Sequence, residues 1–351
     1  MRKLTPIVAN AVVAVKGIVI FFVLTAVSPA FAQSSACDRM CLENTVDRFL
    51  DAFVKHDPKS AGLTRSSKYT ENGQRLELGD GSWRTMVGKG TYRLFVADVP
   101  AGQVAFIGTL REEDRQNKDG TPVLVAMRLK VDKRDISEIE LLVVRNAMAA
   151  LNSEKLGQPN HLFLEDVPSA ERLSRAELVK TANMYFSGMQ RNDGKGVYPF
   201  TDDCDRFENG APTTNVPPKP GEPRADPKTA TNYSSQWGCR EQFESGLLYF
   251  VSRIRDRRYV AVDQERGLVF SFAFFDHMGG DTRHFQTPDG RAVAAGPTTP
   301  WTWELGELFK IEKGKIHRIE AVLTQSPYGM GSGWSSPDDA VSDRARDVTG
   351  R

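Results

Sequence analysis

Hydrophobic side chains recur every three or four residues over positions 38–55, which predicts an amphipathic helix. A second stretch with the same period begins after Ser174, where Glu177 completes a capping box. Apolar or alternating runs of strand length follow each stretch. The pattern therefore predicts a helix followed by a set of strands, twice. The apolar helix positions are Leu42, Val46, Phe49, Leu50 and Phe53, and then Leu178, Ala182, Tyr185, Phe186 and Met189.

Short motifs also repeat in the same order. Tyr69-Thr70-Glu71-Asn72-Gly73 returns as Arg206-Phe207-Glu208-Asn209-Gly210, an offset of 137 residues, and later motifs match at offsets of 165 and 180. An offset that only grows indicates one duplicated unit with insertions in the second copy. The increases place two inserted loops there, within residues 211–235 and 278–300. Loops carry function more often than scaffolds do, which favours the second copy as the functional one.

The chain of 351 residues is long enough for two such units, each with its own core. We expect five segments: a signal peptide over 1–32, a first domain over 33–146, a linker over 147–173, a second domain with the two inserted loops over 174–335, and a flexible tail over 336–351.

The amino terminus has the anatomy of a secretory signal peptide. Arg2 and Lys3 precede an apolar run, and Ala30-Phe31-Ala32 is a typical cleavage site. An uncleaved anchor is the alternative. No later apolar run reaches spanning length, so we expect a secreted or periplasmic protein with no stable membrane insertion after cleavage. The formal net charge of +1 argues against a nucleic-acid partner.

Four cysteines suit an exported protein. The pairing that the spacing favours is Cys37 with Cys41 and Cys204 with Cys239, because the second bridge would close a Pro-rich inserted loop. Four cysteines allow three pairings, and a zinc site is the rival interpretation. The spacings fit no usual zinc finger and the chain has only five histidines, so we expect disulfides and no metal.

Three segments of each copy carry a resemblance to known proteins. They are Cys37-Asp38-Arg39-Met40-Cys41-Leu42, Tyr69-Thr70-Glu71-Asn72-Gly73 and Leu78-Gly79-Asp80-Gly81 in the first copy, and Cys239-Arg240-Glu241-Gln242-Phe243, Phe275-Asp276-His277 and Pro327-Tyr328-Gly329-Met330 in the second. With the element order, they make the chain similar to the nuclear-transport-factor-like superfamily, which includes the SnoaL-like polyketide cyclases. It resembles more closely secreted proteins of unknown function with two such domains in tandem.

The resemblance implies an α+β fold of two tandem cone-shaped domains, each a curved antiparallel sheet wrapped over amphipathic helices. It also implies that the two domains pack on each other as an intramolecular pseudo-dimer. Domains of this type hold a small, mostly apolar ligand in the cone, and a carboxylate there has a raised pKa and can transfer a proton.

Three residues are the candidate catalytic groups: His277, Asp276 and Glu307. Asp276 and His277 end an apolar strand beside the second inserted loop, where the histidine would act as acid or base. Adjacent strand residues point to opposite faces, so the alternative is an ordinary strand end. Glu307 and its neighbour Glu304 lie on another apolar strand, and the position of Glu307 matches Met127 in the first copy.

Other residues of the two copies divide between binding and scaffold. Tyr69, Trp83, Arg128, Trp303 and Tyr328 are the candidate binding residues, with packing in the core as the alternative for the aromatic ones. Tyr328 and Trp334 suggest either a flap over the second cone or a flexible tail. The glutamates that both copies keep, Glu71 with Glu208 and Glu140 with Glu320, are interpreted as structural.

The chain lacks a phosphate-binding loop, a nucleophile elbow and a His-Glu-x-x-His motif. We therefore expect no cofactor. The leading hypothesis is a lyase, isomerase or hydrolase that acts on a small hydrophobic molecule by acid–base chemistry. The alternatives are a non-catalytic periplasmic binding or scaffold protein and a structural partner of the cell envelope, so the sequence leaves open whether the protein is an enzyme.

Overall fold

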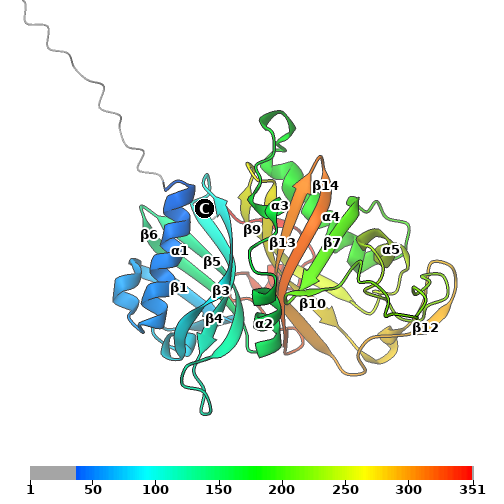
Figure 1. The fold of residues 1–351 in the computed structure, drawn as a ribbon, viewed down its shortest axis with the longest axis horizontal. Helices are drawn as coiled ribbons and strands as arrows, with labels where there is room; N and C mark the ends of the chain where they lie inside the picture. The colour runs from blue at the N-terminus through cyan, green and yellow to red at the C-terminus, as the bar shows by residue number, and fades with distance from the viewer. Residues whose placement is uncertain (1–36, 350–351) are drawn as a thin grey trace, which may run out of the picture. The chain divides into compact units, whose positions relative to one another are not determined.

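Two large curved sheets make up most of the fold (Figure 1). The computed structural model describes residues 37–349, and the expected signal peptide lies outside this range. The elements form a mixed α and β structure with few helices. Both sheets are mainly antiparallel, where purely antiparallel sheets were expected. The first contains one parallel pair, β1 with β6, and the second contains two, β7 with β14 and β9 with β15.

The first sheet has six strands in the order β2-β1-β6-β5-β4-β3. Its elements in chain order are α1 (Arg39–Val54), η1 (Pro58–Ala61), β1 (Leu63–Glu71), β2 (Gln74–Leu76), η2 (Gly81–Arg84), β3 (Met86–Asp98), β4 (Gln103–Glu112), β5 (Thr121–Asp132) and β6 (Asp135–Val144). The connecting segment then forms α2 (Ala147–Lys155), α3 (His161–Leu164) and η3 (Ser169–Glu171).

The second sheet has seven strands in the order β15-β9-β10-β13-β14-β7-β8. Its elements are α4 (Arg175–Arg191), β7 (Phe200–Glu208), β8 (Ala211–Pro212), α5 (Cys239–Glu244), β9 (Arg253–Asp263), β10 (Leu268–His277), β13 (Trp301–Glu312), β14 (Lys315–Ser326), α6 (Pro337–Ala340) and β15 (Arg346–Asp347). The second inserted loop adds η4 (Gly280–Arg283) and a small hairpin of β11 (His284–Gln286) and β12 (Ala292–Ala294).

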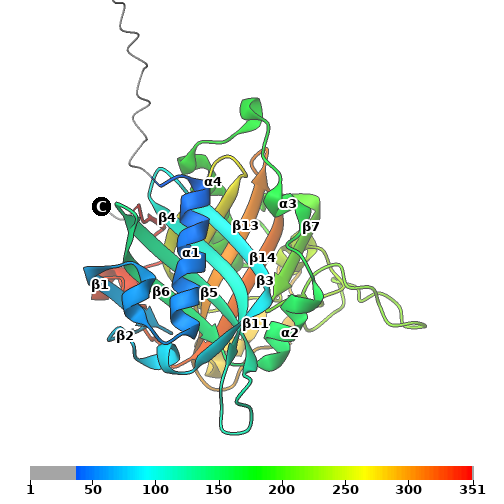
Figure 2. The same cartoon turned by 60° about the vertical axis from the view of Figure 1, so that its left-hand side comes forward.

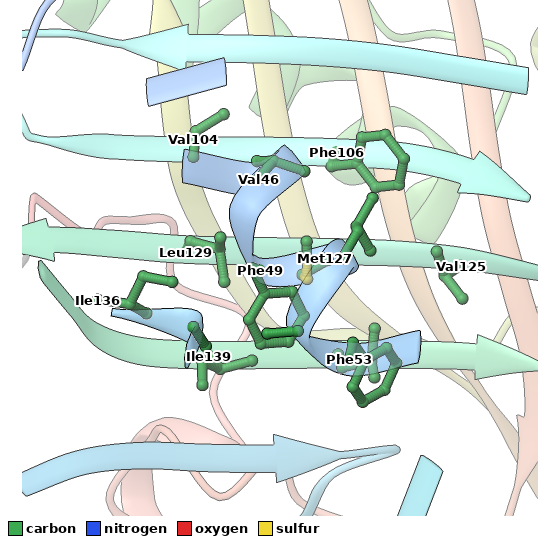
Figure 3. Packing of buried hydrophobic residues seen from close by; sticks show 14 of the residues in the cluster. Val46, Phe49, Phe53, Val104, Phe106, Val125, Met127, Leu129, Ile136 and Ile139 are labelled. Carbon is green, nitrogen blue, oxygen red and sulfur yellow. The ribbon is translucent and has the colours of Figure 1, made fainter. Parts of the chain in front are cut away.

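The two predicted amphipathic helices are confirmed as α1 and α4. Asp38 caps α1 by accepting a hydrogen bond from the Cys41 amide at 2.9 Å, and Ser174 and Glu177 form the predicted capping box of α4. Each helix buries its apolar stripe on one face of its own sheet, which we call the inner face. Figures 2 and 3 show α1 lying across the first sheet, with Phe49 and Phe53 turned toward the strands.

Both predicted disulfides are present, Cys37–Cys41 and Cys204–Cys239. The second joins β7 to α5 and so closes the Pro-rich inserted loop at its base. Helix α5 is short and ends at Glu244. Gly246 follows with a left-handed φ of 69°, which is typical of glycine just after a helix.

The opposite faces of the two sheets bury a shared apolar cluster. Its first-sheet members include Leu94, Ile107, Leu124 and Leu142, and its second-sheet members include Val260, Phe270, Phe272, Leu308 and Val322. Both faces of the central strands are therefore covered, which explains why most residues of β4, β5, β10 and β13 are buried.

Ion pairs and hydrogen bonds accompany this cluster. Arg258 of β9 donates two hydrogen bonds to Glu140 of β6, at 2.7 and 2.9 Å, and Arg128 lies 3.4 Å from the same carboxylate. At another point Tyr92 of β3 donates to Glu320 of β14 at 2.5 Å. Glu140 and Glu320, which match in the two copies, thus have the structural role that the sequence favoured.

Helices α1 and α4 each form one ion pair with the sheet on which they do not pack. Arg39, the first residue of α1, pairs with Asp263 at the end of β9. Arg175, the first residue of α4, pairs with Asp98 at the end of β3. The two arginines occupy equivalent positions at the starts of the helices, and the two aspartates equivalent positions at the ends of the strands.

The carboxyl-terminal segment differs from the flexible tail that was expected. Residues beyond 336 form α6 and β15, and β15 pairs with the edge of β9. Just before them, the Trp334 indole donates to Thr70 of β1 at 2.7 Å and lies over the Arg128 guanidinium. This stacking fixes the segment across both sheets, so Trp334 is not a flap over the inner face of the second sheet.

Among the described residues, no helix combines the length and the hydrophobicity that crossing a membrane requires.

The Glu140 carboxylate allows a direct test of the contact between the two sheets. We expect Glu140→Ala to lower the free energy of unfolding by about 3 kcal/mol or more, because it removes the buried carboxylate that Arg128 and Arg258 share and leaves their charges less compensated. Glu138→Ala is the matched control, since Glu138 also binds Arg128 but is partly exposed and should cost less than about 1 kcal/mol. Urea denaturation measures both, and equal losses would contradict the prediction.

Candidate functional site

A cavity lies on the inner face of the second sheet, between α4 and the first inserted loop. Aromatic and aliphatic side chains form most of its wall, and its polar members are Tyr185, Arg206, Glu208, Tyr233 and Glu307. The free space is about 30 Å³, enough for one or two water molecules. A ligand larger than water would therefore have to displace side chains at the mouth.

Glu307 is the buried acid of this cavity. It alternates with Leu305 and Phe309 on β13, so its side chain shares the inner face with the core. One carboxyl oxygen, Oε2, has no hydrogen-bond partner among the described residues. Burial, with a contribution from the charge of Glu208, raises the Glu307 pKa to about 8, against the opposing effects of Arg206 and a hydrogen bond with Tyr185. Glu307 is therefore mainly protonated at pH 7 and has a free oxygen to present to a ligand.

Arg206 is held rigidly beside the acid. Its Nη2 donates to Gln242 Oε1 at 2.6 Å, and its Nε donates to Thr213 Oγ1 at 3.0 Å. Its Nε also lies 3.1 Å from Glu208 Oε1, and its guanidinium is 2 % exposed. Because Glu208 compensates the arginine charge and Glu307 is mainly neutral, the polar end of the cavity has almost no net charge.

Both inserted loops meet at the mouth of the cavity. Tyr233 of the first loop lies 6.3 Å from the Phe250 ring, between centroids. The second loop passes the same ring at Gly296, where an added Cβ would lie 2.4 Å from Phe250 Cβ. Phe250 and Tyr233 both line the cavity, so the loops close it through these two aromatic side chains.

Asp276 does not reach the cavity. Its side chain points away from the inner face of β10. On the other face it accepts hydrogen bonds from Arg253, Arg255 and Thr302 at 2.7–3.1 Å. Burial alone would raise its pKa, but the hydrogen bonds from Arg255 and Thr302 outweigh it and the Asp276 pKa is lowered. This carboxylate has the environment of a structural ion pair.

His277 points to the inner face but lies one aromatic layer away from the cavity. Its ring stacks on Trp301 at 4.1 Å and meets the edge of Trp303 at 4.8 Å, with Phe250 at 5.9 Å. Neither ring nitrogen has a hydrogen-bond partner among residues 37–349. Burial lowers the His277 pKa to about 4, so the ring is neutral at pH 7. The structure thus does not bring His277, Asp276 and Glu307 together.

The predicted binding residues lie in different parts of the structure. Trp303 lines the cavity, whereas Tyr328 is 40 % exposed and does not. Arg128 faces the other sheet, because the inner face of β5 carries its neighbour Met127 instead. Tyr69 and Trp83 belong to the core of the first sheet.

Glu304 alternates with Glu307 and faces the first sheet. Burial, together with the charge of Glu140, raises the Glu304 pKa to about 8. Its environment is the contact between the two sheets and not a cavity.

Sequence reasoning missed four polar groups of the cavity: Tyr185, Arg206, Glu208 and Tyr233. Tyr185 is part of the apolar stripe of α4, so its hydroxyl gave no separate signal. Arg206 takes the place of Tyr69 in the repeated motif, a change from an aromatic residue to a cation that marks the difference between the copies. Glu208 was interpreted as structural because the first copy keeps it as Glu71.

Residues 171–323 match the model of a family described as a domain of unknown function, DUF8021. The match covers the second sheet from α4 to β14 and includes both Glu208 and Glu307. No curated protein matches the chain. A crystal structure of a de novo designed protein with a curved β-sheet is 18 % identical, over 43 % of this chain and 88 % of that chain, with a TM-score of 0.22. At this TM-score the similarity carries no argument.

The buried acid predicts a specific pH dependence. The folded state holds the Glu307 proton up to about pH 8, whereas the unfolded chain releases it near the ordinary value of 4.5. Its contribution to stability is therefore complete below pH 4.5 and is lost as the pH rises to about 8, by at most about 1.4 kcal/mol per pH unit.

We expect Glu307→Gln to remove this loss, so that its free energy of unfolding rises relative to that of the parent as the pH increases from 5 to 8. Glu77→Gln, at an exposed glutamate, is the control and should follow the parent. A constant difference between Glu307→Gln and the parent across this range, measured by urea denaturation, would show that Glu307 is already ionised.

Proposed function

We propose that the protein is an exported acid–base enzyme, a lyase, isomerase or hydrolase, that acts on a small hydrophobic molecule in the cavity of the second sheet. Glu307 is the proton donor of the reaction. The observation that carries the proposal is the buried, protonated Glu307 carboxyl with an unpartnered oxygen in an aromatic-lined cavity. Buried acids with a shifted pKa in a cavity are typical of functional sites.

The cavity favours a neutral ligand with a hydrogen-bond acceptor. Glu307 offers its proton to an oxygen such as that of a carbonyl group. Arg206 and Glu208 compensate each other, so a charged ligand would have no counter-charge to replace its hydration. The apolar wall, with Trp303 and Phe250, suits the flat body of an aromatic or similar small molecule.

Entry of such a ligand requires movement at the mouth. The present free space holds no more than one or two waters, and Tyr233, which is 39 % exposed, is the outermost aromatic side chain of the wall. We infer that Tyr233 and Phe250 move apart when the ligand binds, with the two inserted loops.

The resemblance to tandem nuclear-transport-factor-like proteins supports this proposal. In that interpretation the two sheets are two cones that form an intramolecular pseudo-dimer, and the ion pairs Arg39–Asp263 and Arg175–Asp98 are its reciprocal contacts. The first cone serves as scaffold, because Phe49, Phe53 and Trp83 fill its interior. The two disulfides suit a secreted or periplasmic location, where the oxidising environment preserves them.

A binding protein without turnover is the second candidate. It is favoured by the position of His277 and Asp276 outside the cavity, which removes the partners that the sequence suggested for Glu307.

A screen of neutral aromatic ketones and lactones for thermal stabilisation tests the proposal. We expect several of them to raise the melting temperature at pH 7, as binding to the native state requires. Glu307→Met should abolish this shift because methionine has no proton to donate, while Glu307→Gln should keep much of it because the amide still donates. A shift that persists in Glu307→Met would contradict the assignment of the cavity. Ligands that bind but are never converted would select the binding protein.

A further inference from the structure

We propose that Glu208 is the base that works with Glu307, so that the cavity holds a matched pair of carboxyl groups. This inference rests on the proposed function and adds a second catalytic residue and a reaction class, proton removal from the carbon next to a carbonyl group.

Strand register places the two carboxyl groups on either side of a gap. Glu208 of β7 is the direct neighbour of Ala321 on β14, and Ala321 is the direct neighbour of Glu307 on β13. Residues in register on adjacent strands point to the same face, and adjacent strands lie about 4.8 Å apart. The two glutamates therefore flank a row in which the middle side chain is a single methyl group, and all three line the cavity.

The first sheet shows the same row without a gap. Glu71 of β1 is the neighbour of Leu141 on β6, and Leu141 is the neighbour of Met127 on β5. Leucine occupies the space that Ala321 leaves open, and methionine takes the place of the acid. Figure 3 shows Met127 within the apolar cluster beneath α1.

The glutamate that both copies keep has different partners in the two rows. Glu71 accepts hydrogen bonds from the Tyr69 hydroxyl, the Ser82 amide and Arg145 at 2.7–2.8 Å, so both of its oxygens are occupied by the protein. Glu208 has Arg206 beside one oxygen and a side chain that is 26 % exposed toward the mouth. Glu208 thus has one ion-pair partner where Glu71 has three hydrogen-bond donors, and its partly exposed side chain in the cavity wall is accessible to a ligand.

The two carboxyl groups can remove one proton from a ligand and donate another proton to it. A ketone that spans Ala321 places its carbonyl oxygen at Glu307 and its α-carbon at Glu208. Glu208 removes the α-proton, the C–H electrons form a carbon–carbon double bond, and the carbonyl oxygen takes the proton of Glu307 to become an enol. Glu208 is then neutral and Glu307 ionised, so the cavity keeps its net charge and Arg206 faces one carboxylate before and after the step.

Exchange of α-hydrogens for deuterium tests the pair directly. We choose 2-tetralone, a neutral aromatic ketone with exchangeable α-hydrogens, in deuterated buffer at pH 7 with the full mature chain, and follow its α-proton signals by NMR. The parent should accelerate exchange above the buffer rate. Glu208→Gln should reduce the enzymatic exchange about 100-fold or more while the ketone still stabilises the protein.

Two variants protect this test against a folding defect. Glu208→Asp keeps a carboxylate beside Arg206 and should recover part of the exchange. Ala321→Leu copies the first sheet and should abolish both stabilisation and exchange. Glu71→Gln is the matched control, which should change stability and leave exchange in the folded protein as in the parent.

The outcomes separate the two proposals. Exchange that Glu208→Gln leaves unchanged would overturn the role of Glu208 and leave the proposed function standing. Stabilisation by the ketone with no accelerated exchange in the parent would overturn the base and favour the binding protein. No stabilisation and no exchange in the parent would reject the proposed function for this class of ligand, and the pair with it.

Discussion

The contact between the outer faces of the two sheets is the constraint on which the rest of the structure depends. Because each sheet is covered on one side by the other sheet and by α2 and α3, its inner face is the one left to receive α1 or α4 and to form a pocket. The buried pair of Arg258 and Glu140 orients this contact, since a shift of either sheet would leave a charge without its partner. Trp334 and β15 then tie the end of the chain across both sheets.

This double covering also explains what the sequence could predict. The helices α1 and α4 have one apolar stripe each, and their caps and the disulfides follow from local spacing. The central strands are buried on both faces, so residues such as those of β10 form an apolar run in which the inner and outer faces look alike. The face of the sheet on which the Arg128 and Asp276 side chains lie therefore depends on the strand register, which a single sequence did not reveal. Asp276 and His277 are neighbours in the chain, but their side chains lie on opposite faces of β10.

The two sheets differ in one row of aligned residues that the repeated motif does not reveal. The repeated Glu-Asn-Gly appears in both, yet Glu71 is saturated by protein donors and Glu208 is not. What differs is the neighbour across the sheet, Leu141 in one and Ala321 in the other, and then Met127 against Glu307. These positions are far apart in sequence and only the strand register joins them. A glutamate that both copies keep thus has different surroundings in the two sheets.

The energetic cost of this difference argues for selection of the site. Replacing a buried leucine with alanine commonly costs about 2–5 kcal/mol, and a buried carboxyl without a full set of partners adds to that cost. The first sheet shows that the fold accommodates leucine and methionine at these positions with a filled core. A sheet that needed only stability would retain that filled arrangement. The second sheet instead keeps a cavity and a protonated acid, and the Cys204–Cys239 bridge offsets part of the loss by closing the loop above them. Departures from local packing rules of this kind are expected at functional sites, and here they fall on one row of three residues.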